Sequence, residues 1–351
     1  MPQSAITRPN LDPTAIFEIF RGSYGSELLT AAVAHFRIFE RLATSHLTFE
    51  ALRNELALQP RPMNVLVTAL KAFGLIEEVD EQLRLTPLAA EHLVDDAYFS
   101  VAGYVGLAAD SPGVKEMIER LTSNRPAGLE PDEAGAAFIF REGVDSAMEE
   151  EKLARHFTLA LAGRAKNVAP VLAERLDLSR AKRLVDVGGG TGIYSIALLQ
   201  ANPQLRAVVL DRPEVLKVAA EMAKEYGVQD RLDLQPADMF TDPLPRDVDA
   251  VLLSNILHDW DIPEGKRLVA RCADSLVAGG RLFIHDVFLN DPLDGPLPIA
   301  LYSAALFTLT EGRAYSAAEY HGWLREAGLR PGTTTPTLIH CGVLEGVSER
   351  S

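Results

Sequence analysis

The chain has 351 residues, of which 49 are acidic and 34 basic, so its formal net charge is -15 at pH 7. Nucleic-acid binding depends chiefly on neutralising phosphate charges, so this balance argues against an extensive nucleic-acid interface and favours a small-molecule ligand. The length predicts two or three domains, and the hydrophobic share of 47% is ordinary for a globular protein.

Cysteine usage and hydropathy exclude further classes of protein. Cys272 and Cys341 are the only cysteines, and they lie far apart without a metal-ligand pattern, so neither a disulfide framework nor a structural zinc is indicated. The first residues lack the apolar core of a secretory signal, and no apolar run approaches the roughly 18 residues of a membrane span. We therefore expect a cytoplasmic protein without a membrane partner.

The N-terminal part is predicted to be mainly helical. Residues 1–13 are polar and contain prolines, which predicts a loose arm. Apolar residues at helical spacing predict one helix over 26–42, and they cover two of its faces, so this helix needs two packing partners. The elements expected next are helices over 49–56 and 62–73 with a turn at 59–62, strands over 75–79 and 83–85, and helix caps at Thr48 and Thr86.

This order of helix, turn, helix and wing invites a DNA-binding interpretation, in which the chain is a ligand-sensing repressor. A recognition helix needs several side chains that read bases or phosphates. The second helix offers Lys71, with Arg61 just before it, and few other candidates. The helix and the acidic composition both weigh against this alternative.

A helical connector is expected over 106–178, between an N-terminal module at 1–105 and an α/β domain at 179–351. Glycines and prolines at 124–135 predict a surface loop within the connector. Apolar residues over 148–175 predict a long helix or a kinked pair. The connector is expected to contribute to a substrate pocket.

From residue 180 onward, strands and helices alternate, which predicts a doubly wound parallel sheet whose ligand crevice lies at the carboxyl ends of the strands. The expected strands are 183–187, 207–210, 232–234, 250–253 and 281–287, with helices at 193–200, 214–226, 263–277 and 316–327. Two final runs, 333–335 and 338–344, would complete the sheet with an antiparallel pair.

The glycine-rich stretch RLVDVGGGTG at 183–192 lies where the first strand turns into a helix. Gly188 and Gly190 permit a tight turn and close approach of a ligand to the backbone. The third glycine of a dinucleotide-binding G-x-G-x-x-G is replaced by Ile193, so a pyrophosphate cradle is not favoured. A nucleotide-like ligand without phosphates fits better.

Acids at the ends of the strands extend this argument. Asp211 ends the second strand about twenty residues after the glycines, where a carboxylate binds a ribose diol. Asp238 follows the third strand and could reach an adenine amino group, with Met239 and Phe240 against the ring. Together with Asp186 on the first strand, these acids fit adenosine.

The motifs LVDVGGGTG, LDRPEV around Asp211, ADMF and LHDWD at 257–261 resemble the S-adenosylmethionine-dependent O-methyltransferases related to plant caffeate and bacterial polyketide O-methyltransferases. The resemblance covers most of the chain. It implies S-adenosylmethionine as cofactor, a hydroxylated small-molecule acceptor, and a homodimer formed through the N-terminal winged-helix module. The residues it places around the cofactor are Gly188, Gly190, Asp211, Arg212, Asp238, Met239, Phe240 and Ser254, with Phe157 as a further aromatic contact.

His258 in LHDWD follows the fourth strand and is expected to be the general base. A phenol of pKa about 10 is only roughly one part in a thousand ionised at pH 7, so an imidazole of pKa about 6.5 is well matched to its proton. The competing structural interpretation is that His258 merely caps the next helix. His285 and His340 are weaker candidates, since His285 alternates with Asp286 along a strand and should face the other way.

Asp286 stands where the resembled family carries a glutamate that orients the base. Because its side chain is one methylene shorter, either the contact is looser or the two backbones are closer. The family's second glutamate corresponds to Ala314, and its lysine four residues before the base to Ser254, so these contacts must differ here. No metal is implied, and a family member that uses the cofactor for chemistry other than methylation is an open alternative.

Overall fold

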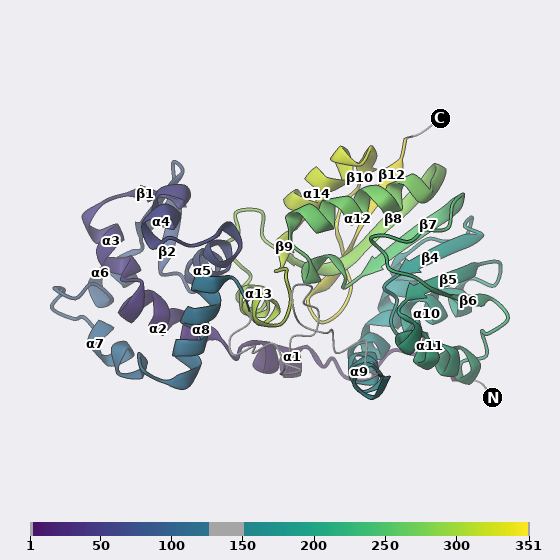
Figure 1. Ribbon diagram of the computed structural model, residues 1–351, viewed down its shortest axis with the longest axis horizontal. Coiled ribbons are helices and arrows are strands. Elements are labelled where there is room, and N and C mark those ends of the chain that lie inside the picture. The colour runs from purple at the N-terminus through teal and green to yellow at the C-terminus, as the bar shows by residue number, and fades with distance from the viewer. Residues whose placement is uncertain (1–2, 126–150, 350–351) are drawn as a thin grey trace. The chain divides into compact units, whose positions relative to one another are not determined.

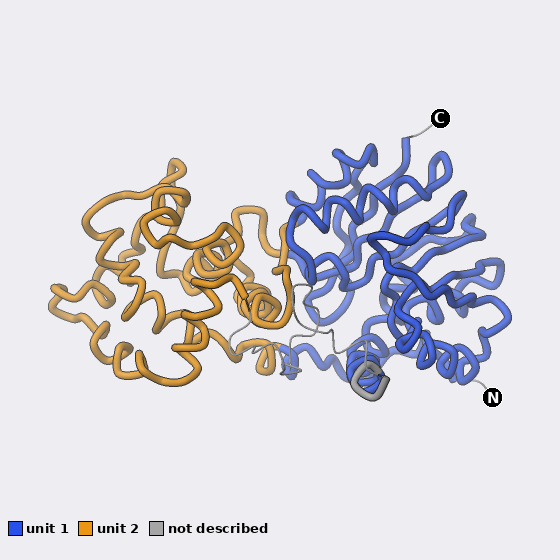
Figure 2. The backbone as a smooth tube through the Cα atoms, viewed as in Figure 1, with its two compact units in different colours: residues 1–17, 138–288, 317–351 blue, residues 18–137, 289–316 orange. Residues whose placement is uncertain are grey.

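The computed structural model describes residues 3–125 and 151–349. The chain divides into two compact units, which Figure 2 colours separately. Unit 1 comprises residues 1–17, 138–288 and 317–351, and unit 2 comprises residues 18–137 and 289–316. The predicted domain bounds at 105 and 178 stay a prediction. Two segments differ from that division. Residues 1–17, expected in the N-terminal module, belong to unit 1, and residues 289–316, expected in the α/β domain, belong to unit 2.

Unit 1 is built on a mixed sheet with the strand order β10-β12-β8-β7-β4-β5-β6 (Figure 1). Its strands are β4 (Arg183–Val187), β5 (Arg206–Asp211), β6 (Leu232–Pro236), β7 (Val248–Ser254), β8 (Leu276–Leu289), β10 (Leu329–Pro331), β11 (Thr335–Pro336) and β12 (Cys341–Ser348). The strands from β6 to β8 are parallel, whereas β12 pairs antiparallel with β8, β10 and β11. The chain runs outward from β4 to β6 and returns to β7 on the other side of β4. In doubly wound sheets ligands bind at such a reversal, which here lies at the carboxyl ends of β4 and β7.

Helices cover both faces of this sheet (Figure 1). They are α9 (Glu151–Arg175), α10 (Ile193–Ala201), α11 (Pro213–Glu225), α12 (Ile262–Ser275) and α14 (Ala317–Glu326), with a short 3₁₀ segment η3 (Leu257–Asp259). The first three helices pack together, and α12 packs with α14. Every residue of α10 from Ile193 to Leu199 is buried, because the segment is apolar on all sides apart from Ser195, whose hydroxyl donates to Asp186. The predicted doubly wound α/β fold is therefore confirmed.

Unit 2 is mainly helical and carries the predicted wing. Its elements are α2 (Gly25–Thr30), the π-helical turn η1 (Ala31–His35), α3 (Ile38–Thr44), β1 (Leu47–Thr48), α4 (Phe49–Leu56), α5 (Pro60–Ala72), β2 (Ile76–Val79), β3 (Gln82–Leu85), α6 (Pro87–His92), α7 (Ala102–Val105), η2 (Gly106–Ala108), α8 (Pro112–Ser123), α13 (Leu297–Leu309) and β9 (Tyr315–Ser316). The strands β1, β3 and β2 form a small antiparallel sheet. Helix α1 (Thr14–Arg21) crosses the boundary between the two units.

The repressor alternative fails on α5, the helix that would have to read DNA. Nine of its residues are buried, and it packs against α8 and α13 inside unit 2. Arg61 is 5% exposed, and its guanidinium donates to the carbonyls of Thr310 and Gly312. Lys71 is paired with Glu78. The two basic residues therefore hold the unit together and are not presented to a ligand.

The single helix expected over 26–42 is wrong, because the chain breaks at Arg37, which has a left-handed φ of 51°. The break lets α3 turn back, so that both apolar faces of this segment are buried within unit 2. Leu28, Ala32 and Phe39 are each 0% exposed. The second apolar face of this segment is thus covered by other parts of the same chain.

The N-terminal arm is not loose. The amide of Gln3 donates to the carbonyl of Glu225 at 3.2 Å, and the amide of Ala5 donates to Gln200 Oε1 at 2.7 Å. Arg8 forms an ion pair with Glu174 on α9. These contacts with distant segments leave no periodic signal in the arm itself, so its composition alone misled the prediction.

Several element boundaries also differ from those expected. The turn expected at 59–62 is the first turn of α5, because a proline fits the first helical position. The helix expected to reach 277 ends at Ser275. The runs expected at 333–335 and 338–344 correspond to β11 and β12, and the strand β10 before them was not expected. Of the long helix expected over 148–175, residues 148–150 lie outside the described residues, as does most of the loop expected at 124–135. The rest is one helix, α9, with Pro170 inside it.

Candidate active site

The glycine turn after β4 has the geometry that its sequence predicts. Gly188 and Gly190 have φ values of 68° and 59°, in the left-handed region that favours glycine. A Cβ on Gly188 would lie 2.5 Å from Ile256 Cδ1, which belongs to the segment after β7. The turn therefore brings bare backbone against the end of β7, at the switch point of the sheet.

Asp211, at the end of β5, is joined to this turn. Its Oδ2 accepts from the amide of Gly190 at 2.8 Å, and its Oδ1 accepts from the amide of Arg212 at 2.7 Å. Burial raises the pKa of the Asp211 carboxyl, while these two amides and Arg212 oppose the rise. The carboxylate is thus fixed beside the glycine backbone, where the sequence placed a ribose.

Asp186 on β4 is a further acid of this region. It is 0% exposed, its Oδ2 accepts from Ser195 at 2.7 Å, and its Oδ1 has no hydrogen-bond partner among the described residues. Burial raises the pKa of Asp186 to about 7. A buried oxygen without a partner, next to a turn without side chains, is the environment that a polar ligand completes.

Residues 238–240 follow β6 as expected. Asp238 is exposed, and its Oδ1 accepts from the amide of Phe240 at 2.7 Å. The carbonyl of Met239 accepts from Arg271 at 3.0 Å. The ring of Phe240 is buried edge-on to Trp260, with centroids 4.7 Å apart. Phe240 therefore packs against Trp260 in the core with one side of its ring.

Ser254 at the end of β7 pairs with His285 on the neighbouring β8. His285 and Asp286 are consecutive on β8, so their side chains face opposite sides of the sheet. Ser254 Oγ lies 2.8 Å from His285 Nδ1, and Thr337 Oγ1 lies 3.1 Å from His285 Nε2. Burial lowers the pKa of His285 to about 3, so its ring is neutral at physiological pH. With both ring nitrogens engaged, His285 is not the base. Ser254 is held by a side-chain network here, and its expected role at the cofactor stays a prediction.

His258 and Asp286 meet as the strand order predicted. His258 lies in η3 just after β7, Asp286 lies near the end of the adjacent β8, and His258 Nδ1 is 2.5 Å from Asp286 Oδ1. The shorter aspartate therefore does not loosen the contact. The helix that follows is capped by Asp261, which accepts from the amide of Ile262. The structural interpretation of His258 as a helix cap is thus wrong.

Both members of the pair are buried, and each alters the pKa of the other. Burial would lower the pKa of His258, but the carboxylates of Asp286 and Asp259 outweigh it, so the net shift is upward from 6.5. Burial would raise the pKa of Asp286, but His258 and the amide of Val287 hold it below its usual value. The geometry fixes the histidine tautomer with Nδ1 toward the Asp286 carboxylate, so that Nε2 lies on the side of Asp259.

Asp259, within the LHDWD motif, is a residue that the sequence argument missed. Its Oδ1 lies 3.6 Å from His258 Nε2, and burial raises its pKa to about 6. Its place directly after His258 was the available signal. Phe157 on α9 is half-buried with its ring edge-on to His156, and its cofactor contact stays a prediction. Ala314 is fully buried in unit 2.

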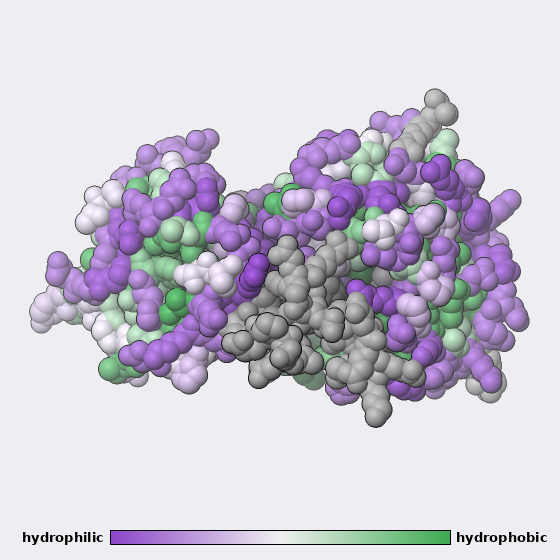
Figure 3. Space-filling view, in the orientation of Figure 1, coloured by the Kyte–Doolittle hydropathy of each residue, from purple (hydrophilic) through white to green (hydrophobic). Residues whose placement is uncertain are grey.

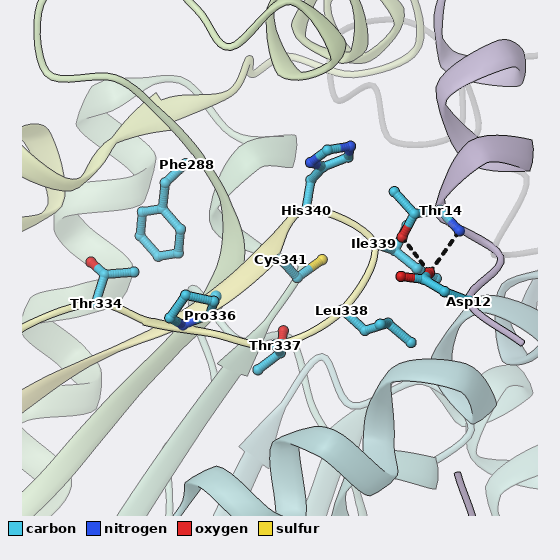
Figure 4. A pocket seen from close by; sticks show the side chains of 11 residues that line it. Asp12, Thr14, Phe288, Thr334, Pro336, Thr337, Leu338, Ile339, His340 and Cys341 are labelled. Carbon is cyan, nitrogen blue, oxygen red and sulfur yellow. Dashed lines mark hydrogen bonds between the residues drawn. The ribbon is translucent and has the colours of Figure 1, made fainter. Parts of the chain in front are cut away.

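A cavity of about 410 Å³ lies at the same edge of the sheet, between the β11–β12 loop and the N-terminal arm (Figure 4). Phe288, Pro336, Leu338 and Ile339 give it apolar walls, and Asp12 and His340 lie on its polar side. None of the residues expected at the cofactor or the base lines this cavity. Its link to the reacting pair is Phe288, whose ring stands edge-on to Tyr320 at 5.7 Å.

Other classes of site find no support in the described residues. Within 3–125 and 151–349 there is no group of three or more histidine, cysteine, aspartate or glutamate side chains that could hold a metal ion. Among the described helices, none has the length and apolarity to cross a membrane. The face drawn in Figure 3 is mainly hydrophilic, with hydrophobic residues in scattered places.

The doubly wound sheet, the glycine turn fixed to a strand-end aspartate, and the buried histidine–aspartate pair at the ends of β7 and β8 are features of a class I methyltransferase. The sequence profile of the O-methyltransferase domain matches residues 134–330. The chain therefore belongs to this O-methyltransferase family, and it is an S-adenosylmethionine-dependent O-methyltransferase.

Two bacterial relatives match nearly the whole chain. The 3-hydroxy-5-methyl-1-naphthoate 3-O-methyltransferase of Streptomyces sahachiroi is 36% identical over 90% of this chain and 89% of its own. The tetracenomycin polyketide synthesis 8-O-methyltransferase of Streptomyces glaucescens is 30% identical over 92% and 93%. A solved O-methyltransferase family 2 protein of Planctomyces limnophilus, in complex with apigenin, is 45% identical over 99% of both chains, with a TM-score of 0.89.

Proposed function

We propose that this enzyme methylates a phenolic hydroxyl on a flat, fused-ring small molecule, with His258 as the general base. The observation that carries the proposal is the buried contact between His258 and Asp286 at the carboxyl end of the sheet. The names of two similar proteins support the acceptor class: one is a methyltransferase of a hydroxynaphthoate, the other is solved in complex with the flavone apigenin, and both compounds are planar hydroxylated aromatics.

S-adenosylmethionine fits the residues around the glycine turn. We assign Asp211 to its ribose, the backbone of Gly188 and Gly190 to close approach, and Asp238 with Met239 to its adenine. The unpartnered Oδ1 of Asp186 provides an additional acceptor for a cationic or hydroxyl group. When bound, this cofactor supplies an electrophilic methyl group on a sulfonium.

The work of the chain in this mechanism is to remove and hold one proton. His258 Nε2 takes the proton of the acceptor hydroxyl, while Nδ1 keeps its own proton in the hydrogen bond to Asp286. The imidazolium that forms is stabilised by the Asp286 carboxylate, which stays ionised because its pKa is lowered. A general base of this kind contributes about a hundredfold to ten-thousandfold, and correct orientation adds further rate.

Asp259 lies on the side of His258 from which the acceptor proton arrives. With its pKa raised to about 6, its carboxylate is ionised above that pH and can accept a hydrogen bond from a second hydroxyl of the acceptor. We therefore favour acceptors with two neighbouring polar groups over simple phenols.

The direct test is a methylation assay with S-adenosylmethionine and a panel of hydroxylated naphthoates, flavones and anthraquinones. We expect one equivalent of S-adenosylhomocysteine for each methoxy group formed, and faster turnover on fused-ring acceptors than on phenol itself. Cofactor consumption without a methylated product would instead support a family member that has changed its chemistry.

Methylation at carbon is the second candidate, because a relative from Streptomyces lavendulae, an L-tyrosine C(3)-methyltransferase, is 30% identical over 92% of this chain. Removal of the phenol proton activates the neighbouring ring carbon as well as the oxygen, so the same base would serve both reactions. The mass of the product is the same, but a C-methylated product loses an aromatic proton in its NMR spectrum and keeps its hydroxyl.

We also propose that the chain forms a homodimer through unit 2 and α1, although the helix over 26–42 is not the reason. The large apolar side chains that are exposed cluster on α1, with Ile19 and Phe20 at 82% and 78%, and on the stretch 98–107, with Tyr98 and Leu107 at 93% and 81%. Apolar exposure on this scale is typical of an interface.

Light scattering should therefore give twice the chain mass, and Phe20→Asp should shift the population toward monomer because it places a charge in the apolar contact. Glu18→Asp, on the same helix, is the matched control that should leave the dimer intact. A wild-type monomer at high micromolar concentration would refute the interface.

A further inference from the structure

The carboxylate of Asp286 has a second contact, on the oxygen that does not face His258. Its Oδ1 accepts from His258 Nδ1 at 2.5 Å and from the amide of Val287 at 2.8 Å. Its Oδ2 accepts from the hydroxyl of Tyr320 at 3.3 Å. Asp286 is 1% exposed, so bulk water does not compete for either oxygen.

The position of the Tyr320 hydroxyl is set by core packing. Tyr320 lies on α14 and is 0% exposed. Its ring stands edge-on to Trp323, with centroids 5.1 Å apart, and to Phe288 on β8 at 5.7 Å. Trp323 in turn packs against α12 so closely that a Cβ on Gly265 would lie 2.6 Å from its ring. These contacts hold the buried ring, and with it the hydroxyl oxygen, beside Asp286.

A buried tyrosine usually finds a hydrogen-bond partner simply to satisfy its hydroxyl, so the contact alone shows nothing about the reaction. Two further features give it meaning. The partner is the carboxylate that orients the base, and the position where the resembled family carries a second acid is Ala314, which has no polar side-chain atom.

We propose that Tyr320 is a positioning residue of the methyl transfer, whose hydroxyl fixes the Asp286 carboxylate so that its Oδ1 faces His258. This inference rests on the proposed function of His258 as the base. A carboxylate that accepts a hydrogen bond from tyrosine is a weaker base than one without it, so it holds the Nδ1 proton of His258 less tightly. Tyr320 therefore orients the pair and also keeps the pKa of His258 from rising further.

Other charged or titratable groups act on the same pair and stay unchanged in the test. Asp259 in η3 and Asp286 itself raise the pKa of His258, whereas Arg164 on α9 lowers it. His285, next to Asp286 on β8, is neutral because burial lowers its pKa to about 3. A shift in the pH profile on changing Tyr320 can therefore be assigned to its hydroxyl.

The test is Tyr320→Phe, which removes the hydroxyl and keeps the ring. We expect kcat to fall about threefold to thirtyfold with KM and the cofactor Kd nearly unchanged. The acidic limb of the kcat profile should move to higher pH by roughly 0.3 to 1 unit, the size expected for one hydrogen bond. Asp286→Asn should move that limb to lower pH, because it removes the negative charge that favours the imidazolium.

Tyr226→Phe is the matched control, since Tyr226 is also buried in unit 1 but lies at the end of α11, away from the pair. It should leave kcat and the pH profile unchanged. If Tyr320→Phe lowers only the melting temperature and leaves the acidic limb where it was, Tyr320 is structural and the inference is wrong.

Two further variants separate this inference from the proposed function. In a His258→Ala background, Tyr320→Phe should cost no additional turnover, because its effect passes through the base. If His258→Ala is itself fully active, the proposed base fails and the inference fails with it. If Tyr320→Phe does not fold, 3-fluorotyrosine at position 320 keeps the packing and donates more strongly, so the acidic limb should then move to lower pH, and an unmoved limb refutes the inference.

Discussion

Replacing His258 by alanine should lower turnover by two to four orders of magnitude and leave the affinity for S-adenosylmethionine nearly unchanged. The loss reflects the missing general base, because a phenol of pKa about 10 is almost entirely protonated at pH 7. The affinity should survive because the residues assigned to the cofactor lie at the ends of β4, β5 and β6, whereas His258 follows β7. Calorimetry and initial rates measure the two quantities separately.

The same variant provides a sharper measurement when the acidity of the acceptor is varied. An acceptor that is already ionised needs no base, so the difference between wild type and His258→Ala should shrink as the pKa of the phenol falls. His35→Ala is a suitable control, since it also removes an imidazole, but one in unit 2 that is hydrogen-bonded to the backbone carbonyl of Ala109. Near-normal turnover of His258→Ala on a weakly acidic phenol would mean that catalysis rests on proximity alone.

The pH dependence of the wild type follows from the sign of the pKa shift. The base acts only when His258 is neutral, and its pKa is raised above 6.5 by Asp286 and Asp259 against the opposing effect of burial. The rate should therefore fall as the pH drops through a value above 6.5, and this limb should be absent in His258→Ala. A limb well below 6.5 would contradict the buried pair as the titrating group.

Replacing Asp211 by alanine should weaken the binding of S-adenosylmethionine by about 1.5 to 3 kcal/mol, or roughly tenfold to 150-fold. The variant loses the acceptor assigned to the ribose hydroxyls, and it also leaves the amides of Gly190 and Arg212 without their partner. Because the Gly190 amide belongs to the glycine turn, the loss should exceed that of a simple surface carboxylate.

Asp233→Ala is the matched control for Asp211, since it makes the same chemical change on the neighbouring strand β6. Asp233 is exposed and lies 3.8 Å from Arg206, an ion pair that contributes little. Calorimetric titration of both variants should show a loss only for Asp211→Ala. Equal affinities would remove Asp211 from the ribose, and tighter binding of NAD than of S-adenosylmethionine in the wild type would contradict the cofactor assignment.

The α/β part of the fold and the core of the candidate site could be predicted from the sequence because their signals are local. Apolar runs that end in acids or glycines predict strands with functional ends, and parallel strands bring such ends together. His258 and Asp286 are 28 residues apart, yet they meet because each follows or ends a neighbouring strand. The glycine turn and Asp211 meet for the same reason, at the ends of the neighbouring strands β4 and β5.

Contacts that depend on how distant elements pack could not be predicted in this way. The N-terminal arm looked loose because its partners, on α9, α10 and α11, lie far along the chain. The sequence alone did not exclude DNA binding, because it does not show that α5 packs against α8 and α13. Tyr320 reaches Asp286 from α14, 34 residues along the chain, through a ring held by aromatic neighbours. The periodicity of a sequence indicates which face of an element is apolar. Which other element packs against that face depends on how well the side chains fit together, and this is seen only in the tertiary structure.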